Sequence, residues 1–163
     1  MADEKQLKQA KLVYETLCQC LDSMGWTYDR NDGELTVYTG AAGRDIPIEL
    51  NLRVDPIRHL VTVLSKIPVE QNNATAVDLS VTVSAINNHL VDGSFDYNMT
   101  DVLVFRLTSS YLDSLLSEDL FQYMICIACR TVDDYNKIFS LVSKGEMTCE
   151  DVIKKIYGDT NNG

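Results

Sequence analysis

The chain has 163 residues, of which 45% are hydrophobic and 23% are charged. These proportions are typical of one globular domain, and a chain of this length buries enough surface to need neither a disulfide framework nor a structural metal. Its 24 acidic and 14 basic residues give a net charge of −10. That charge disfavours binding to a nucleic-acid backbone or to an anionic membrane surface.

The cysteine count and the N-terminal segment indicate the compartment. Five cysteines are an odd number, the first eleven residues are polar, and no apolar run approaches the roughly 18 residues of a membrane span. We therefore expect a cytoplasmic protein with reduced thiols. We also expect one domain over residues 1–163, with its core at about 5–157 and a flexible tail at 158–163.

The first predicted element is an amphipathic helix over Glu4 to Ser23, with Asp3 as its N-cap and Gly25 beyond its end. Its apolar face comprises Leu7, Ala10, Tyr14, Leu17 and Leu21. A β-hairpin follows, with strands over 26–30 and 35–39, because the turn at 31–34 contains Asn-Asp-Gly and supplies residues that adopt positive φ.

Two further strands are predicted over 46–54 and 59–64, after a loop at Gly40 to Gly43. The first of them alternates apolar and polar residues almost strictly, which is typical of a half-buried strand. Because Pro47 has no N–H to donate to a ladder, its strand should lie at an edge or begin there. Together the four strands form an antiparallel meander.

The segment Asn72 to Val91 carries both an alternating pattern and a helical stripe. A strand of nearly twenty residues would be far too long, so we predict a helix. A second hairpin is expected over 93–97 and 102–107, with its turn at Asn98 to Asp101.

Two helices should complete the chain. The longer one begins at the N-cap Ser117 and ends at Gly145, and a short one follows Thr148. The apolar face of the longer helix comprises Phe121, Ile125, Ala128, Val132, Tyr135, Phe139 and Val142. The resulting fold class is α+β.

Cys126-Ile-Ala-Cys129 is the most conspicuous short motif. Redox motifs of this spacing place their reactive thiol at a helix N-terminus, whereas this pair lies two turns inside a predicted helix. Zinc binding together with Cys18 and Cys20 is the alternative, but those two thiols would point about 200° apart on their helix. We predict buried or half-buried thiols and neither metal nor cofactor.

No catalytic residue is predicted. His59 and His89 are isolated in the sequence, and no serine lies in a nucleophile-elbow context. The Gly40–Gly43 loop lacks the Lys-Ser/Thr of a phosphate-binding loop. We therefore expect a protein that is not an enzyme.

The order of predicted elements, together with residues 86–97 (INNHLVDGSFDY), resembles the YbjN family and, through it, the type III secretion chaperone-like fold. The segment 102–107 is similar to the next strand of that family. The sequence Leu-Ser-Glu-Asp at 116–119 is similar to the start of its long C-terminal helix. The resemblance covers about residues 5–145. It implies a sheet of a four-strand meander plus a two-strand hairpin, packed by an N-terminal, a central and a long C-terminal helix.

The resemblance also implies a small, acidic, non-enzymatic bacterial protein. Secretion chaperones of this fold form homodimers and hold an extended segment of an effector, and the YbjN branch is described as a regulator. We expect a chaperone-like or regulatory protein-binding module that forms a homodimer, with neither nucleic acid nor membrane as partner. The candidate dimer or partner contacts, each of which an ordinary core role would also explain, are Leu79, Val83, Ile86, Phe95, Tyr97 and Val104.

The alternative hypothesis is a small-molecule-sensing domain that binds a ligand between the sheet and the helices. Its candidate aromatic wall comprises Trp26, Tyr28 and Tyr38, with Tyr97 as a further member.

Overall fold

The computed structural model describes residues 2–70, 72–99 and 102–158. Its elements, in chain order, are α1 (Glu4–Ser23), β1 (Tyr28–Asn31), β2 (Thr36–Ala42), β3 (Pro47–Asp55), β4 (Leu60–Ile67), α2 (Ala76–His89), β5 (Ser94–Tyr97), β6 (Leu103–Ser110), α3 (Glu118–Ser143) and α4 (Cys149–Tyr157). The predicted α+β order is confirmed, including the helix at 76–89. Residues 100–101 of the predicted turn and 159–163 of the predicted tail lie outside the described residues.

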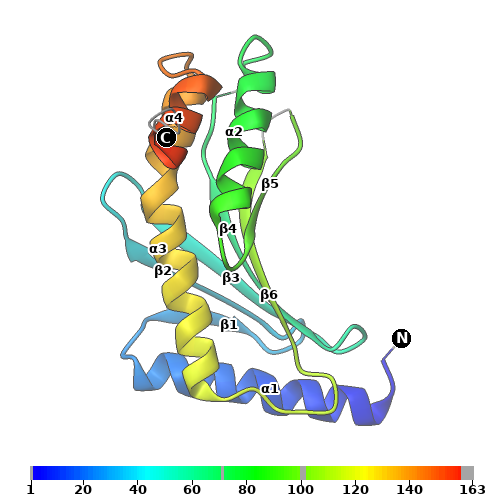
Figure 1. Cartoon of the computed structure of the whole chain (residues 1–163). Coiled ribbons are helices and arrows are strands. Elements are labelled where there is room, and N and C mark those ends of the chain that lie inside the picture. The colour runs from blue at the N-terminus through cyan, green and yellow to red at the C-terminus, as the bar shows by residue number, and fades with distance from the viewer. Residues whose placement is uncertain (1, 71, 100–101, 159–163) are drawn as a thin grey trace.

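All six strands belong to one antiparallel sheet with the order β1-β2-β3-β4-β6-β5. The meander and the hairpin are joined where β4 pairs with β6, from Leu60 opposite Ser110 to Ile67 opposite Leu103. Figure 1 shows the long β4 and β6 side by side behind the helices. The edges of the sheet are therefore the two short strands β1 and β5.

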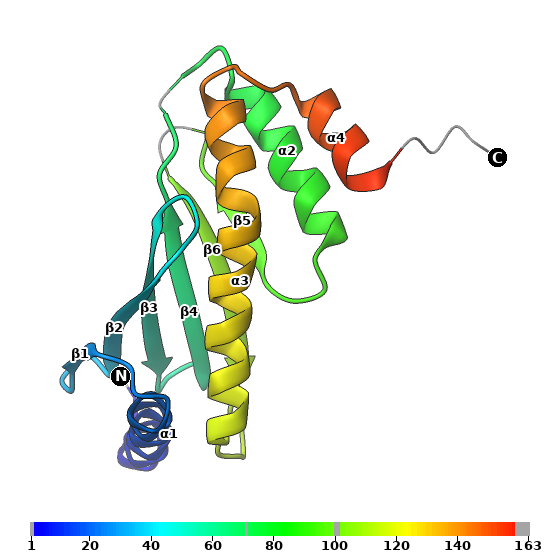
Figure 2. The same ribbon diagram turned by 90° about the vertical axis from the view of Figure 1, so that its left-hand side faces the viewer.

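The helices cover one face of this sheet, and α3 runs along its length (Figure 2). Every second strand residue faces them, and Leu52, Val63 and Phe105 are fully buried there. Phe95 lies between Phe105 and Phe139, with ring centroids at 5.2 Å and 4.8 Å. Such tilted aromatic contacts stabilise beyond the area that they bury.

Hydrogen bonds at the helix starts confirm the predicted caps. The Asp3 side chain accepts from the backbone N–H of Gln6, and Ser117 accepts from that of Leu120. Thr148 and Asp151 form a reciprocal capping box at the start of α4.

Three details of the predicted elements differ from the structure. Leu7 is 40% exposed and lies at the margin of the apolar face of α1, whereas Val13, which was not included in the predicted face, is fully buried. The predicted loop at Gly40–Gly43 is mostly strand, because Gly40, Ala41 and Ala42 pair with β3. Pro47 does begin its strand, but β3 lies inside the sheet.

Candidate functional site

The face of the sheet that the helices leave uncovered carries a large cavity. One register row crosses this face from Asp29 through Tyr38, Asn51 and Leu64 to Arg106. The cavity follows part of that row and has a volume of about 570 Å³. It is lined by Thr27, Tyr28, Asp29, Tyr38, Thr39, Glu49, Leu50, Asn51, Leu64, Lys66 and Val104.

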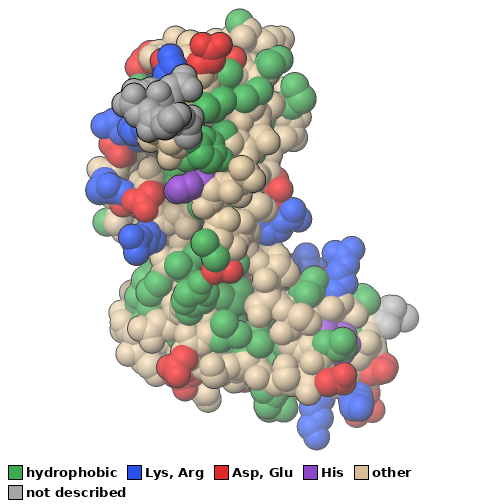
Figure 3. All heavy atoms as spheres, in the orientation of Figure 1, with side chains coloured by type: hydrophobic (Ala, Val, Ile, Leu, Met, Phe, Trp, Pro, Cys, Tyr) green, Lys and Arg blue, Asp and Glu red, His purple; other side chains and the backbone are tan. Residues whose placement is uncertain are grey.

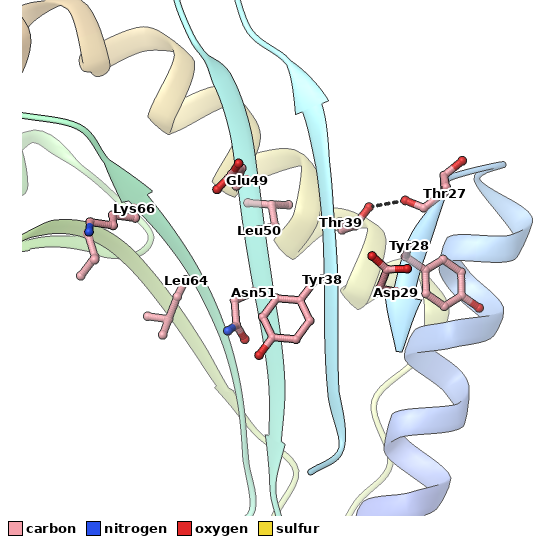
Figure 4. Close-up of a pocket in the computed structure, with 11 residues that line it drawn as sticks. Thr27, Tyr28, Asp29, Tyr38, Thr39, Glu49, Leu50, Asn51, Leu64 and Lys66 are labelled. Carbon is pink, nitrogen blue, oxygen red and sulfur yellow. Dashed lines mark hydrogen bonds between the residues drawn. The ribbon is translucent and has the colours of Figure 1, made fainter. Parts of the chain in front are cut away.

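The cavity lies where β3 and β4 separate. Their register runs from Asp55 opposite Leu60 to Asn51 opposite Leu64 and stops there. Beyond that point residues 47–50 of β3 pair with β2 alone, and residues 65–67 of β4 pair with β6 alone. Figure 4 shows the two strands diverging towards Glu49 and Lys66, with α3 behind the opening. We call this opening, between 47–50 and 65–67, the β3–β4 cleft.

A second cavity of about 260 Å³ lies at the wide end of the β3–β4 cleft. It is lined by Ile46, Pro47, Glu49, Lys66 and Pro68. Both cavities share Glu49 from β3 and Lys66 from β4. The cleft is therefore one continuous feature between the two strands.

Arg44, in the turn between β2 and β3, attaches this hairpin to α3. Its backbone N–H donates to Asp133 at 2.7 Å, and its Nε lies 2.6 Å from the other oxygen of the same carboxylate. Its second guanidinium nitrogen lies 2.5 Å from Asp134. These hydrogen bonds from Arg44 hold the pKa of Asp133 below its ordinary value. We call these contacts the Arg44 clamp; they hold the tip of the hairpin against α3 while β4 continues along β6.

The charges around the cleft are mostly unpaired. Asp29, Glu49 and Lys66 take part in none of the ion pairs found among residues 2–70, 72–99 and 102–158. Arg106, further along the same face, pairs with Asp96 at 2.8 Å. The two cavities along the cleft thus offer two carboxylates, of which Asp29 lies further away on β1, and one ammonium group.

Most of the predicted contact residues belong to the core. Leu79, Val83, Ile86 and Phe95 are buried beneath the surface, where a partner does not reach them, because the apolar stripe of α2 packs on the sheet and on α3. This corrects the prediction for those four residues. Tyr97 and Val104 are half-buried and remain accessible.

The outer side of α2 carries apolar residues that the sequence reasoning missed. Val77 is 63% exposed and Val81 is 38% exposed. Their spacing of four residues places them on one side of the helix. The prediction used the longer apolar stripe on the opposite side, which proves to be buried.

Only part of the predicted aromatic wall lies at a cavity. Tyr28 and Tyr38 line the large cavity, whereas Trp26 is half-buried against the core and is not among the lining residues. The cavity also lies on the uncovered face and not between the sheet and the helices, because core side chains fill that space. The Tyr28 hydroxyl donates to Asp22 of α1 at 2.9 Å, and this bond turns its ring away from Tyr38 (Figure 4).

All five cysteines are free thiols on helices. Burial raises the pKa of Cys129 to about 11, and it also raises the pKa values of Cys18 and Cys20. Since the thiolate is the reactive form, these shifts oppose nucleophilic chemistry. Within the described ranges no three His, Cys, Asp or Glu side chains are grouped so as to hold a metal ion.

No helix in the part of the chain that the structure describes is both long and apolar enough to cross a membrane.

No family model matches the sequence, and no curated protein matches it. Several solved chains share its architecture, among them the following two. YbjN from E. coli, a suggested transcription regulator, superposes with a TM-score of 0.57 at 12% identity, over 83% of this chain and 94% of YbjN. A chain of the ExsC–ExsE complex superposes with a TM-score of 0.57 at 11% identity, over 78% of this chain and 93% of its own length.

The chain has the YbjN and ExsC fold. This confirms the predicted resemblance to the YbjN family and to the secretion chaperone-like fold. At these identities the likeness concerns the fold alone.

Proposed function

We propose that this protein is a non-enzymatic, chaperone-like or regulatory module that binds another protein in the cytoplasm. The observation that carries the proposal is the YbjN and ExsC fold with one sheet face left uncovered and hollowed. ExsC was solved in complex with ExsE, so one neighbour of this fold holds a protein partner. A sheet with free edges and a cavity on its surface is a general means of binding a polypeptide.

We further propose a homodimer formed through the outer sides of α2 and α4. Val77 and Val81 on α2 and Ile153 and Tyr157 on α4 are exposed large hydrophobic residues. The two helices pack together, and the Tyr157 hydroxyl donates to the carbonyl oxygen of Ala85 at 2.8 Å. Figure 3 shows hydrophobic side chains gathered over α2. Such a contiguous patch is typical of an interaction surface.

Light scattering at several concentrations tests the dimer. The unmodified protein should have twice the mass of the chain, and Val81→Asp should give the single mass because it places a charge in the interface. Thr108→Asp, on the exposed side of β6, is the matched control and should leave the dimer intact. A monomer at every concentration would contradict the homodimer.

Affinity purification from the source cells tests the protein-binding function itself. The tagged chain should retain a defined polypeptide in stoichiometric amount after washing with salt. A chain that retains none would contradict the proposed function, whatever its oligomeric state.

A small molecule in the large cavity is the second candidate function. A volume of about 570 Å³ suits a ligand of modest size, and Tyr38 and Asn51 offer an aromatic ring and an amide. A ligand at 100 times its dissociation constant would stabilise the fold by about 2.7 kcal/mol. A thermal-shift screen of metabolites should then raise the melting temperature; a flat response would count against this candidate.

A further inference from the structure

We propose that the β3–β4 cleft binds an extended, basic polypeptide segment by pairing with the free strand edges on either side of it. This inference rests on the proposed protein-binding function, and it assigns a place and a chemistry to the partner. The observations that carry it are the interrupted ladder, the two joined cavities and the unpaired charges around them.

The interrupted ladder argues for a polypeptide backbone as the occupant. In a sheet each strand directs its N–H and C=O groups alternately to its two neighbours. Residues 47–50 have β2 on one side and residues 65–67 have β6 on one side, but neither segment has a ladder partner across the cleft. An extended chain presents donors and acceptors at the spacing that such edges require.

The dimensions of the cleft fit a short segment. Four residues of β3 provide an edge of about 13 Å, at roughly 3.3 Å per residue, and the three facing residues of β4 provide slightly less. The helix α3 lies behind the opening (Figure 4), so the covered side is closed and a segment enters from the uncovered face. Three or four residues of the partner would lie between the strands.

The side chains around the cleft define the chemistry of that segment. Leu64 and Val104 are half-buried and Tyr38 is 47% exposed on the uncovered face, so together they form an apolar platform. Asp29 and Glu49 lie beside this platform without an ion pair among the described residues. Alternate residues of a strand face opposite ways. Those directed towards α3 would meet the buried apolar side chains of β3 and β4, and those directed outwards would meet the carboxylates, so the matching segment alternates apolar and basic residues.

Charge complementarity extends beyond the cleft. The chain has a net charge of −10, which attracts a basic segment over several ångströms and repels an acidic one. Lys66 is the one cation among the residues lining either cavity. It lies on the β4 side, where it can meet a carbonyl group or the C-terminal carboxylate of the segment.

The Arg44 clamp keeps the cleft open. Its contacts with Asp133 and Asp134 hold the β2–β3 turn on α3. Without them only the 3.9 Å pair of Asp45 with Lys137 joins this turn to α3 among the described ion pairs, so the hairpin could close on β4 more easily and continue the ladder. Arg44→Glu should therefore weaken binding of the segment without changing any residue that lines the cavities.

The experiment uses a phage library of random 12-residue peptides selected against the full chain. Enriched peptides are synthesised with a fluorophore, and their affinity is measured by anisotropy. We expect alternating basic and apolar residues among the enriched sequences. Affinity should fall at least tenfold for Leu64→Glu and stay within twofold for Thr108→Glu, which places the same charge on the same face outside the cleft.

N-methylated peptides test the pairing itself, in the unmodified protein. Methyl groups on the amides that face one strand edge should weaken binding at least about tenfold, because each removes a main-chain hydrogen bond and blocks close approach. Methyl groups on the alternate amides should have little effect. Equal effects of the two sets would overturn strand pairing, and this readout does not depend on how a variant folds.

The remaining outcomes separate this inference from the proposed function. Peptides that bind Leu64→Glu as well as the unmodified chain would overturn the cleft as the site and leave the protein-binding function standing. A library that yields no binder would overturn the inference, while purification of a natural partner decides the function independently. Displacement of the peptides by a small molecule from the thermal-shift screen would instead assign the cavity to that ligand.

Discussion

The two ends of the junction between β3 and β4 are built in opposite ways. At the closed end, Asp55 lies opposite Leu60, and Tyr111 is fully buried beside them. The Tyr111 hydroxyl donates to the Asp55 carbonyl at 2.7 Å, and its backbone N–H donates to His59 at 2.9 Å. At the open end the ladder has stopped, and the exposed Arg44 clamp positions the hairpin.

This difference shows how one sheet can combine a rigid part with an adaptable one. Buried aromatic packing and main-chain hydrogen bonds hold the closed end, and salt screens neither of them strongly. Exposed ion pairs hold the open end, and such pairs contribute little stability and weaken in salt. Regions that bind a partner are drawn from the less stable parts of a fold, which supports the open end as the proposed binding surface.

Hydrogen exchange should reveal the largest contrast. Amides of residues 51–55 and 60–64 that belong to the ladder should exchange slowly, with protection that approaches global stability. Amides of 48–50 and 65–67 that face the cleft should exchange several orders of magnitude faster, while those paired with β2 or β6 remain protected. Exchange measured residue by residue by NMR checks this. Uniform protection along both strands would mean that the cleft is closed in solution.

A matched pair of tyrosine substitutions should give the next largest effect. Tyr111→Ala should lower the free energy of unfolding by about 3–5 kcal/mol, since it empties a buried aromatic site and removes the hydrogen bond to Asp55. Tyr38→Ala, at the 47% exposed Tyr38 beside the cleft, should cost less than about 1 kcal/mol. Urea unfolding measures both. Equal losses would contradict the contrast between the ends.

Ser65 offers a smaller test within the open half of β4. Its Oγ is buried and has no hydrogen-bond partner in the part of the chain that the structure describes. Ser65→Ala should therefore leave stability unchanged or raise it by up to about 1 kcal/mol. Ser143→Ala is the control, because that buried hydroxyl accepts from Glu70 and donates to Ser140; it should lose about 1–2 kcal/mol. A clear loss for Ser65→Ala would indicate a partner for its hydroxyl.

The order of elements could be predicted from the sequence because each element has a strong local signal. The capping residues Asp3, Ser117 and Thr148 mark helix starts, and the period of apolar residues distinguishes helix from strand. The segment of α2 has both a strand-like and a helix-like pattern, and its length excludes a strand.

The position of the cleft could not be predicted, because it depends on pairing between strands and not on the pattern within one. Residues 47–50 and 51–54 of β3 alternate in the same way, yet only the second group pairs with β4. The Arg44 clamp joins residues 89 and 90 positions apart. Tyr38 was identified as a candidate from its residue type, whereas Glu49 and Lys66 gave no signal that would separate them from other surface charges.

The Arg44 clamp should give the smallest effect on stability and the clearest dependence on pH. In the folded protein Arg44 holds the pKa of Asp133 below its ordinary value of 3.8. A carboxyl group whose pKa is lowered by folding stabilises the folded state at any pH above its ordinary pKa. This stabilisation is lost as the pH falls through the pKa of the folded state. Arg44→Ala should therefore be slightly less stable than the unmodified protein at pH 7, and the difference should vanish in acid and shrink in high salt.

Arg58→Ala is the matched control, because Arg58 is exposed and takes part in no ion pair among the described residues. Its stability should follow that of the unmodified protein at every pH. Hydrogen exchange adds a structural readout. If Arg44→Ala lets the hairpin close on β4, the amide of Glu49, which faces the cleft, should become more protected even though a surface contact was lost. Such a gain of protection at the open end, once the Arg44 clamp is removed and only the 3.9 Å pair of Asp45 with Lys137 of α3 remains there among the described ion pairs, would show that the clamp works against strand pairing and keeps the sheet divided.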